Sequence, residues 1–456
     1  MRIGEHWRAI DPAWKFAFIA YLTARVALSA WAFVVATLFP VVAQNLDLFG
    51  APVLAVFDLA SGERYAYSRE VEGAALTFRV GDPGFVIDTQ TGSVWLLRVG
   101  RAVSGKFAGR TFAASSYPIE EVFPYRGVAA EQNLLLSVWQ RFDTNWLLKI
   151  AQRGYSDDGS TVYFPLYPFL TRVVSIVGGD SMFAALLISN LALIGALAML
   201  YRLGEALFDT SSARRVIAYW LLFPTAFFLM AAYTESLFLF LTLAAFDSAH
   251  RSRWIIAALF GALAALTRLQ GVLLVIPLAW MWWQNDRRLP TADHCIAHVI
   301  GFTPLLLIPL ATAAFLAFTN LSLLSSYVGE LHARFVLPWD NLGALIALLA
   351  SGRASVVDGL NLLTTLGFGA MVLAVWRVLP REYGLYALAM YLAPLFRMTT
   401  MQPLVSMDRY ALVLFPAFIV WGAWGKNVWV NRAVMYLSFP LQLFLSAQFV
   451  MWGWVG

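Results

Sequence analysis

The stretch WKFAFIAYLTARVALSAWAFVVATLFP, residues 14–40, is apolar over a length that can cross a lipid bilayer as a helix. A spanning helix needs about 20 apolar residues, whereas the apolar region of a signal peptide has only roughly 7–15. The basic residues Arg2, Arg8 and Lys15 precede this stretch or stand at its start. We therefore predict a retained membrane helix whose N-terminal end lies on the cytoplasmic side.

Apolar runs of this kind recur throughout the chain. Hydrophobic residues make up 60% of the 456 residues and charged residues only 13%, with a mean hydropathy of +0.68. Soluble proteins average about a quarter charged residues, so this composition predicts an all-α polytopic membrane protein. About eleven spanning helices are expected, near residues 14–40, 182–207, 214–231, 234–249, 255–268, 271–284, 295–319, 356–378, 384–397, 408–425 and 432–454.

The charges between these helices predict the orientation of the chain. The short turns at 179–181 and 231–234 contain no Lys or Arg and are assigned to the outside. Lys and Arg favour the cytoplasmic side of membrane proteins. The loops assigned to that side contain Arg202, Arg214, Arg215, Arg251, Arg253, Arg287, Arg288, Arg377, Arg381, Lys426 and Arg432. This distribution accounts for the net charge of +5, so the charge predicts no nucleic-acid partner.

Residues 41–138 form one long segment outside the membrane with a different composition. Short β-branched and aromatic runs, such as VLAVFDLASGERYAYSR and GFVIDTQTGSVWLLRV, alternate with Gly-containing turns. They predict a small β-rich extracytoplasmic insertion after the first helix. We accordingly divide the chain into an N-terminal transmembrane helix (1–45), the insertion (46–125), an interfacial and re-entrant segment (126–180) and a transmembrane helical bundle (181–456).

The interfacial segment carries an acid beside aromatic residues. On a helix over 130–153 the apolar side chains form one stripe, Asp143 lies at the edge of that stripe, and Gly154 is suited to end the helix. The stripe consists of Leu135, Trp139, Phe142, Trp146 and Ile150. The next apolar stretch, 162–178, contains two prolines, so a re-entrant or tilted segment is expected.

The helix ends assigned to the outside collect polar side chains that apolar segments exclude. Such residues can have no function beyond extending to water from the membrane edge. The basic residues among them, however, lie on the side that the positive-inside rule disfavours. Ionisable groups at membrane depth commonly mark a functional site. Arginine donates paired hydrogen bonds to phosphate, and a carboxylate can accept a proton from an attacking hydroxyl. A phosphate leaving group needs no acid, although other chemistry of phosphate-bearing lipids also fits. The residues are Asp143, Glu235, Arg268, Gln270, His332, Arg334, Arg397, Asp408 and Arg409.

Three motifs, FDTNWLLKIAQRGY…YFPLYP, FPTAFFLMAAYTESLFLFLTLAAF and LTRLQG, resemble the GPI mannosyltransferase 2 family with its bacterial PIG-V-like relatives. The likeness is greatest over 139–285, continues more weakly at 338–339 and 408–416, and does not include 46–125. Members of this family are integral membrane glycosyltransferases of the C-type (GT-C) fold. The resemblance therefore implies a GT-C-like arrangement of the helices.

The resemblance also implies an activity: transfer of a sugar, in this family mannose, from a polyprenyl-phosphate donor to an acceptor on the extracytoplasmic face, with inversion. It assigns the catalytic roles to Asp143 and Glu235, and its Arg-x-x-Gly element corresponds to Arg268 and Gly271. The substrate-binding residues that we predict are Arg268, Gln270, Arg409, Arg334, His332, Tyr163, Tyr167 and Trp139.

The expected partners are the polyprenyl-phosphate sugar donor, a lipid, glycan or protein acceptor, and membrane lipids, with no nucleic acid and no cofactor. The need for a divalent metal stays open. In a bacterium the protein is expected in the plasma membrane. The sequence departs from the family at Phe142, where Trp is usual, and in the insertion at 46–125, which leaves the acceptor undefined.

Two other functions stay open, a multi-pass lipid or solute transporter and a scaffold that presents the β-rich insertion. Transporters commonly have related halves and binding sites at the membrane midplane. Here the polar residues gather at one face, and no repeated half is evident. This pattern favours the enzyme over the transporter.

Three local patterns have ordinary explanations. GRAVSGKF, residues 100–107, resembles a P-loop but has Phe107 where Ser or Thr would bind magnesium. His294 and His298 could hold zinc, yet they fall at a helix end where polar residues are expected. Asp157 and the acid after it could bind a cation, but SDDGS is also typical of a turn.

Overall fold

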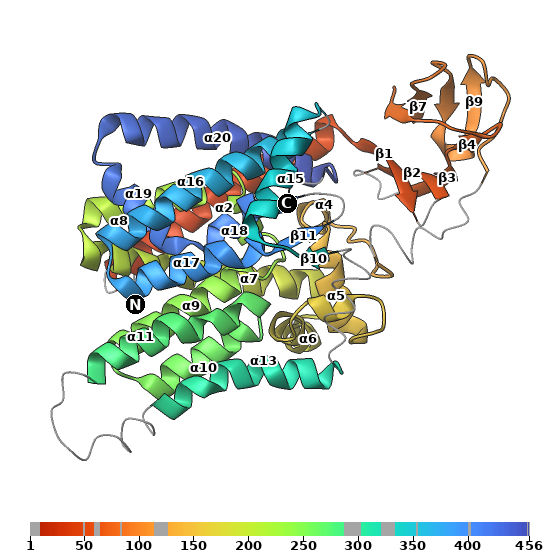
Figure 1. The fold of residues 1–456 in the computed structure, drawn as a ribbon. Coiled ribbons are helices and arrows are strands. Elements are labelled where there is room, and N and C mark those ends of the chain that lie inside the picture. The colour runs from red at the N-terminus through yellow and green to blue at the C-terminus, as the bar shows by residue number, and fades with distance from the viewer. Residues whose placement is uncertain are drawn as a thin grey trace, which may run out of the picture. The chain divides into compact units, whose positions relative to one another are not determined.

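The computed structural model describes residue 455 and residues 10–453 with gaps at 49–50, 59–63, 83, 114–125, 287–301, 321–332, 353 and 400–402. The chain is mostly helical and divides into two compact units (Figure 1). The helical unit comprises Met1–Ala27, Ile150–Leu445 and Val455–Gly456. The second unit comprises Leu28–Lys149 and Ser446–Trp454. The predicted division at 46–125 stays a prediction.

Among the described residues, four helices are long and apolar enough to cross a membrane, so the chain is a membrane protein. They are α2 (Pro12–Leu38), α7 (Ser181–Leu207), α16 (Val356–Val378) and α20 (Val428–Val450). Each overlaps one of the spans expected near 14–40, 182–207, 356–378 and 432–454. The expectation of about eleven spanning helices stays a prediction.

The shorter helices of the helical unit differ in places from the predicted spans. They are α6 (Leu166–Gly178), α8 (Thr210–Leu221), α9 (Glu235–His250), α10 (Trp254–Ala265), α11 (Val275–Asp286), α13 (Leu307–Phe318), α15 (Pro338–Ala350), α17 (Arg381–Leu395), α18 (Met407–Tyr410) and α19 (Phe415–Trp424). The helix predicted at 214–231 is wrong, because α8 ends at Leu221 and Pro224 follows. The helix predicted at 408–425 is interrupted between α18 and α19, and α15 was not predicted.

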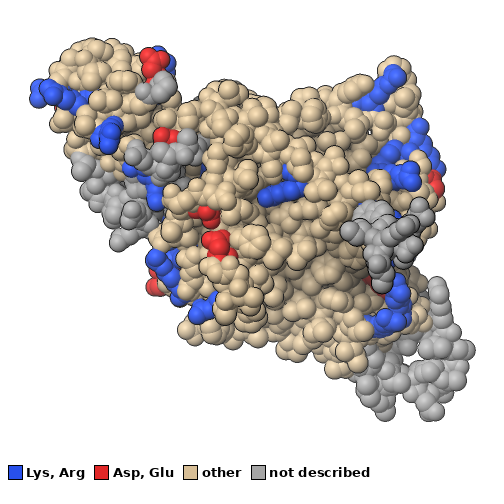
Figure 2. Space-filling model, turned by 180° about the vertical axis from the view of Figure 1, so that it is seen from behind, with Lys and Arg blue, Asp and Glu red and all other residues tan. Residues whose placement is uncertain are grey.

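One end of the helical unit brings basic residues together. Arg202, near the end of α7, pairs with Asp11 at 3.2 Å, and Lys426 pairs with Asp209 at 2.8 Å. His250, at the end of α9, is hydrogen-bonded to Tyr383 of α17 at 2.8 Å. These contacts gather loops that the sequence assigned to the cytoplasmic side. Figure 2 shows Lys and Arg side chains at this end, beside a broad surface with few charges.

The second unit contains two larger antiparallel sheets. The first has the order β1-β2-β3 (Val41–Leu48, Ala51–Asp58 and Arg64–Ser68). The second has the order β6-β7-β8-β9 (Phe78–Val80, Phe85–Asp88, Val94–Leu96 and Arg101–Ser104). The fully buried Trp95 stacks on Phe112 with ring centroids 4.2 Å apart. The stretch 100–107 forms β9 and a turn, and Phe107 lies in the core of this unit.

The segment that carries Asp143 is two helices rather than one. The continuous helix predicted over 130–153 is wrong: α4 covers Leu134–Ser137 and α5 covers Asp143–Arg153. Phe142, between them, has a φ of 46°, a left-handed conformation that interrupts a right-handed helix. Gly154 ends α5 with a φ of 83°, as predicted.

Candidate functional site

Glu235 is the centre of a buried ionic cluster in the helical unit. It is the first residue of α9 and is fully buried. Its Oε1 atom accepts from Nη1 of Arg268 at 2.6 Å and from Nε of Arg409 at 2.5 Å. Arg268 follows α10, and Arg409 belongs to α18. One carboxylate oxygen thus links two guanidinium groups that come from distant parts of the sequence.

Aromatic rings line the same cluster. The guanidinium of Arg409 lies 4.6 Å from the ring centroid of Tyr233. Arg268 and Arg397 both lie over the ring of Tyr410, at 5.6 Å and 6.0 Å. The cluster therefore contains three guanidinium groups, and cation–π contacts hold them in place. The side chains of Arg268 and Arg409 are only 11% and 13% exposed, so their charges are weakly screened by water.

Asp408 is the second carboxylate of this region and is also buried. Its backbone carbonyl accepts from the Thr225 hydroxyl at 2.8 Å, and its backbone N–H donates to Asn361 at 3.3 Å. These bonds fix α18 and hence the position of Arg409. Among the described residues, three guanidinium groups and two carboxylates thus gather in this region.

The backbone directly before Glu235, residues 230–234, is buried and is not part of an α-helix. Membrane-buried carbonyls need internal partners, and here side chains supply them. The Met230 carbonyl accepts from Arg25 at 2.9 Å and from Asn190 at 3.1 Å. The Tyr233 carbonyl accepts from Ser189 at 2.9 Å. These bonds set the direction in which Glu235 enters α9.

The glycine of the Arg-x-x-Gly element has a steric function. A Cβ atom on Gly271 would lie 2.5 Å from backbone atoms of Ala264, at the end of α10. The backbone N–H of Gly271 donates to the Arg268 carbonyl at 2.8 Å. Only glycine lets the 3-10 helix η4 (Leu269–Leu274) fold this tightly against α10. The close approach thereby sets the position from which Arg268 reaches Glu235.

A short two-stranded ladder separates two arginines that the sequence placed together. Strand β10 (Ala333–Phe335) pairs antiparallel with β11 (Arg397–Thr399), with Arg334 opposite Met398 and Phe335 opposite Arg397. Residues opposite each other share a face, and neighbours along a strand alternate. Arg397 and Arg334 thus lie on opposite faces. Arg397 faces Tyr410, whereas Arg334 is exposed. The role of Arg397 was missed because the register is not visible in the sequence.

The other predicted substrate-binding residues have varied surroundings. The Tyr167 hydroxyl is buried and donates to the Ala185 carbonyl at 2.8 Å, beside Ser189. The Tyr163 carbonyl accepts from Tyr155 at 2.8 Å. Gln270 lies in η4, and its Oε1 is buried with no hydrogen-bond partner among the described residues. His332 lies outside the described residues.

Asp143 belongs to the second unit, where neighbouring residues fix its backbone. Arg141 is buried, donates from Nε to the Val450 carbonyl at 2.9 Å, and lies 4.5 Å from the ring centroid of Trp452. Phe142 packs on the same indole, with ring centroids 5.6 Å apart. Asp143 follows as the half-buried first residue of α5, where the helix dipole favours a carboxylate.

Trp139, predicted to bind substrate, is only 1% exposed and lies in the core. The predicted convergence of Asp143 with Arg268 and Arg409 concerns residues of two separate units and stays a prediction.

In the part of the chain that the structure describes, no group of three His, Cys, Asp or Glu side chains is placed to hold a metal. Asp158, an alternative cation ligand, accepts from the backbone N–H of Ser160 at 3.1 Å.

The comparison with protein families identifies one segment. Residues 110–284 match the family described as mannosyltransferase (PIG-V). A comparison with curated proteins found no match. The matched segment contains Asp143, Glu235 and Arg268, whereas Arg397 and Arg409 lie beyond it. Over residues 110–284 this membrane protein is therefore similar to the PIG-V mannosyltransferase family, which confirms the resemblance drawn from its motifs.

Proposed function

We propose that the chain transfers mannose from a polyprenyl-phosphate donor to a hydroxyl acceptor on the extracytoplasmic face of the membrane, with inversion at the anomeric carbon. The observation that carries this proposal is the cluster of Arg268, Arg397 and Arg409 around the buried Glu235. The family match supports the sugar. The proposed side of the membrane is supported by the basic residues at the other end of α9.

The positively charged guanidinium groups of the cluster should bind the departing phosphate monoester more strongly than the phosphodiester of the intact donor. A phosphodiester donor carries one negative charge, whereas the phosphate monoester that leaves carries about −1.5 to −2 at neutral pH. Guanidinium groups in a poorly screened site therefore stabilise the departing phosphate more than the bound donor. Such a difference lowers the barrier to transfer.

The buried acceptor atoms of the same region suit a sugar. Oε2 of Glu235, Oε1 of Gln270 and Oδ2 of Asp408 have no hydrogen-bond partner among the described residues. A buried acceptor without a donor costs roughly 1–3 kcal/mol. Hydroxyl groups of a bound sugar would supply donors, so occupancy would relieve this cost. Glu235 would then orient both the arginines and the sugar.

Asp143 is the proposed general base. The acceptor hydroxyl gives its proton to the Asp143 carboxylate while its oxygen forms a bond to the anomeric carbon. The bond from that carbon to the phosphate oxygen breaks, and its electron pair stays with the phosphate. Attack from the face opposite the leaving group inverts the configuration. No acid is needed, because the arginines neutralise the phosphate.

The test is transfer by the full chain reconstituted in lipid vesicles. Polyprenyl-phosphate mannose, its glucose analogue and a nucleotide-activated mannose are supplied in turn, and extracted products are analysed by mass spectrometry. We expect transfer from polyprenyl-phosphate mannose alone. Asp143→Asn should bind the donor but lose transfer, whereas Asp157→Asn, in an exposed turn, should keep it. Transfer from the nucleotide donor, or full activity of Asp143→Asn, would contradict the proposal.

A further inference from the structure

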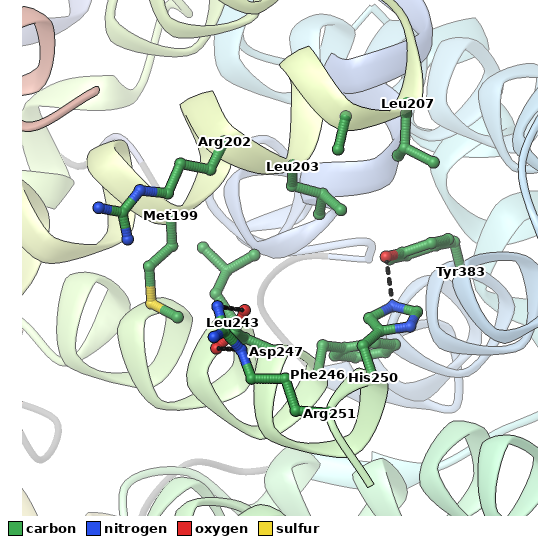
Figure 3. Close-up of a pocket in the computed structure, with 11 residues that line it drawn as sticks. Met199, Arg202, Leu203, Leu207, Leu243, Phe246, Asp247, His250, Arg251 and Tyr383 are labelled. Atoms are coloured by element: carbon green, nitrogen blue, oxygen red, sulfur yellow. Dashed lines mark hydrogen bonds and ion pairs between the residues drawn. The ribbon is translucent and has the colours of Figure 1, made fainter. Parts of the chain in front are cut away.

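Two cavities adjoin at the end of α9 that lies away from Glu235. One, of about 410 Å³, lies between α7, α9 and α17 (Figure 3). The other, of about 430 Å³, lies between α9, α11 and α17. His250 lines both. A helix rises about 1.5 Å per residue, so roughly 22 Å separates His250 from Glu235. These cavities are therefore distinct from the candidate site.

The two cavities differ in polarity. The wall of the first is formed largely by apolar side chains of α7 and α9, among them Leu203, Leu207, Leu243 and Phe246. The second is lined by Gln284, Asn285, Arg381 and Glu382. An apolar space that continues into a polar one matches a molecule with an apolar chain and a polar head.

His250 is held at the junction of these spaces. Its Nε2 is hydrogen-bonded to the Tyr383 hydroxyl at 2.8 Å, and Tyr383 stacks on Phe246 with ring centroids 5.4 Å apart. When the Tyr383 hydroxyl donates to Nε2, Nδ1 carries the ring proton and can donate to a ligand. The imidazole is exposed to solvent, so a ligand can reach it.

Basic side chains around the cavities can donate to a phosphate. Arg202, Arg251 and Arg381 line the cavities together with Asp247 and Glu382, and Arg202 also pairs with Asp11 at 3.2 Å. Asp247 holds Arg251 through both of its oxygens, each 3.0 Å from a guanidinium nitrogen. The side chains of Arg202 and Arg251 stay 48% and 57% exposed. Their exposed guanidinium N–H groups can therefore donate to the oxygens of a phosphodiester.

The cavities lie at the end of α7, and this position indicates that the phosphodiester belongs to a membrane lipid. Helix α7 is a candidate membrane span, and its last turns form the apolar wall. The cavities therefore lie where a spanning helix leaves the apolar layer, at the depth of lipid headgroups. We propose that they bind one glycerophospholipid, with its phosphate at His250 and Arg251, its chain along α7 and its headgroup beside Gln284 and Asn285.

The test uses the full chain, delipidated in detergent and titrated with short-chain phosphatidylglycerol while bound lipid is counted by native mass spectrometry. His250→Ala and Arg251→Gln should each weaken binding about tenfold, the loss of one charge-assisted hydrogen bond. Tyr383→Phe, which keeps the ring, should weaken it less. Arg432→Gln is the control, because Arg432 lies over Trp429 and lines neither cavity.

Two further ligands distinguish the source of the phosphate. Glycerol phosphate has the charge without the chain and should bind at least tenfold more weakly than the lipid. Short-chain diacylglycerol has the chains without the phosphate and should bind weakly, with no sensitivity to His250→Ala. Equal binding of either ligand and the phospholipid would overturn the proposal. Unchanged lipid binding by a folded His250→Ala protein would also overturn it.

Discussion

Glu235 and Arg268 form an ion pair of 2.6 Å between a fully buried carboxylate and a guanidinium that is 11% exposed. The same carboxylate oxygen also accepts from Arg409. A buried charge that loses its partner is strongly destabilising, because it stays away from water without compensation. Glu235 is therefore expected to be needed for folding as well as for the proposed transfer.

Glu235→Gln should lower the stability of the protein by about 3–5 kcal/mol, since it leaves two buried guanidinium groups without their shared acid. The readout is the unfolding temperature of the purified chain in detergent. Glu205→Gln is the matched control, because Glu205 is exposed on α7. The control should unfold as the parent does. An unchanged unfolding temperature for Glu235→Gln would contradict the ion-pair cluster.

Gly271→Ala tests the contact that sets the position of Arg268. A Cβ atom 2.5 Å from the Ala264 backbone cannot be accommodated unless η4 moves away from α10. We expect about 1–3 kcal/mol of destabilisation, as for other overpacked sites, and a reduced transfer rate. Gly367→Ala is the control, because it lies in α16 and its Cβ would meet nothing within 4 Å. That change should be neutral or stabilising.

Asp88 should make the β-sheets of the second unit sensitive to acid. Its burial raises the pKa, but hydrogen bonds from Thr91, Trp95 and Ser93 outweigh this and lower the pKa below its ordinary value. A lowered folded-state pKa stabilises the fold above the ordinary pKa of about 4, and this contribution is lost as the pH falls through the lowered value.

Asp88→Asn measures this contribution. At pH 7 the variant should be cleaved faster than the parent by protease within residues 78–104, and the difference should shrink as the pH falls below the ordinary carboxyl pKa of about 4. Cleavage sites can be mapped by mass spectrometry on the full chain. Asp82→Asn serves as the control. A difference that persists unchanged in acid would show that the carboxylate charge is not responsible.

The sequence predicted the long helices well, because a run of about 20 apolar residues allows few alternatives in a membrane. Helix α16 has the predicted bounds, and α7 differs by one residue. The stretch 222–231 was misread as part of a spanning helix. It is as apolar as a span, but distant side chains such as Arg25 and Asn190 satisfy its backbone. Contacts of that kind are not visible in a local pattern.

The sequence predicted which residues form the candidate site, but it predicted their spatial arrangement only in part. Glu235, Arg268 and Arg409 were each singled out, and the structure brings them into one cluster. The helix around Asp143 was predicted as continuous because Phe142 is apolar and fits a helical stripe, yet its positive φ breaks the helix. That conformation is stabilised by tertiary packing on Trp452, which lies far along the sequence.

The antiparallel pair β10–β11 provides a matched pair of arginines for testing the proposed phosphate site. Arg397 faces Tyr410 and the cluster, whereas Arg334 is exposed on the other face of the ladder. Arg397→Gln should reduce kcat/KM for the lipid-linked donor roughly 10- to 100-fold, the worth of one charge-assisted bond to phosphate. Arg334→Gln should change it less than threefold.

The split between kcat and KM identifies the step at which Arg397 acts. If its charge stabilises the departing phosphate, kcat should fall more than the affinity for the donor, because the second negative charge develops only as the bond breaks. Arg397→Lys should recover part of kcat, since it restores the charge without the planar fork. Equal losses for Arg397→Gln and Arg334→Gln would mean that the strand register does not determine which arginine serves the donor.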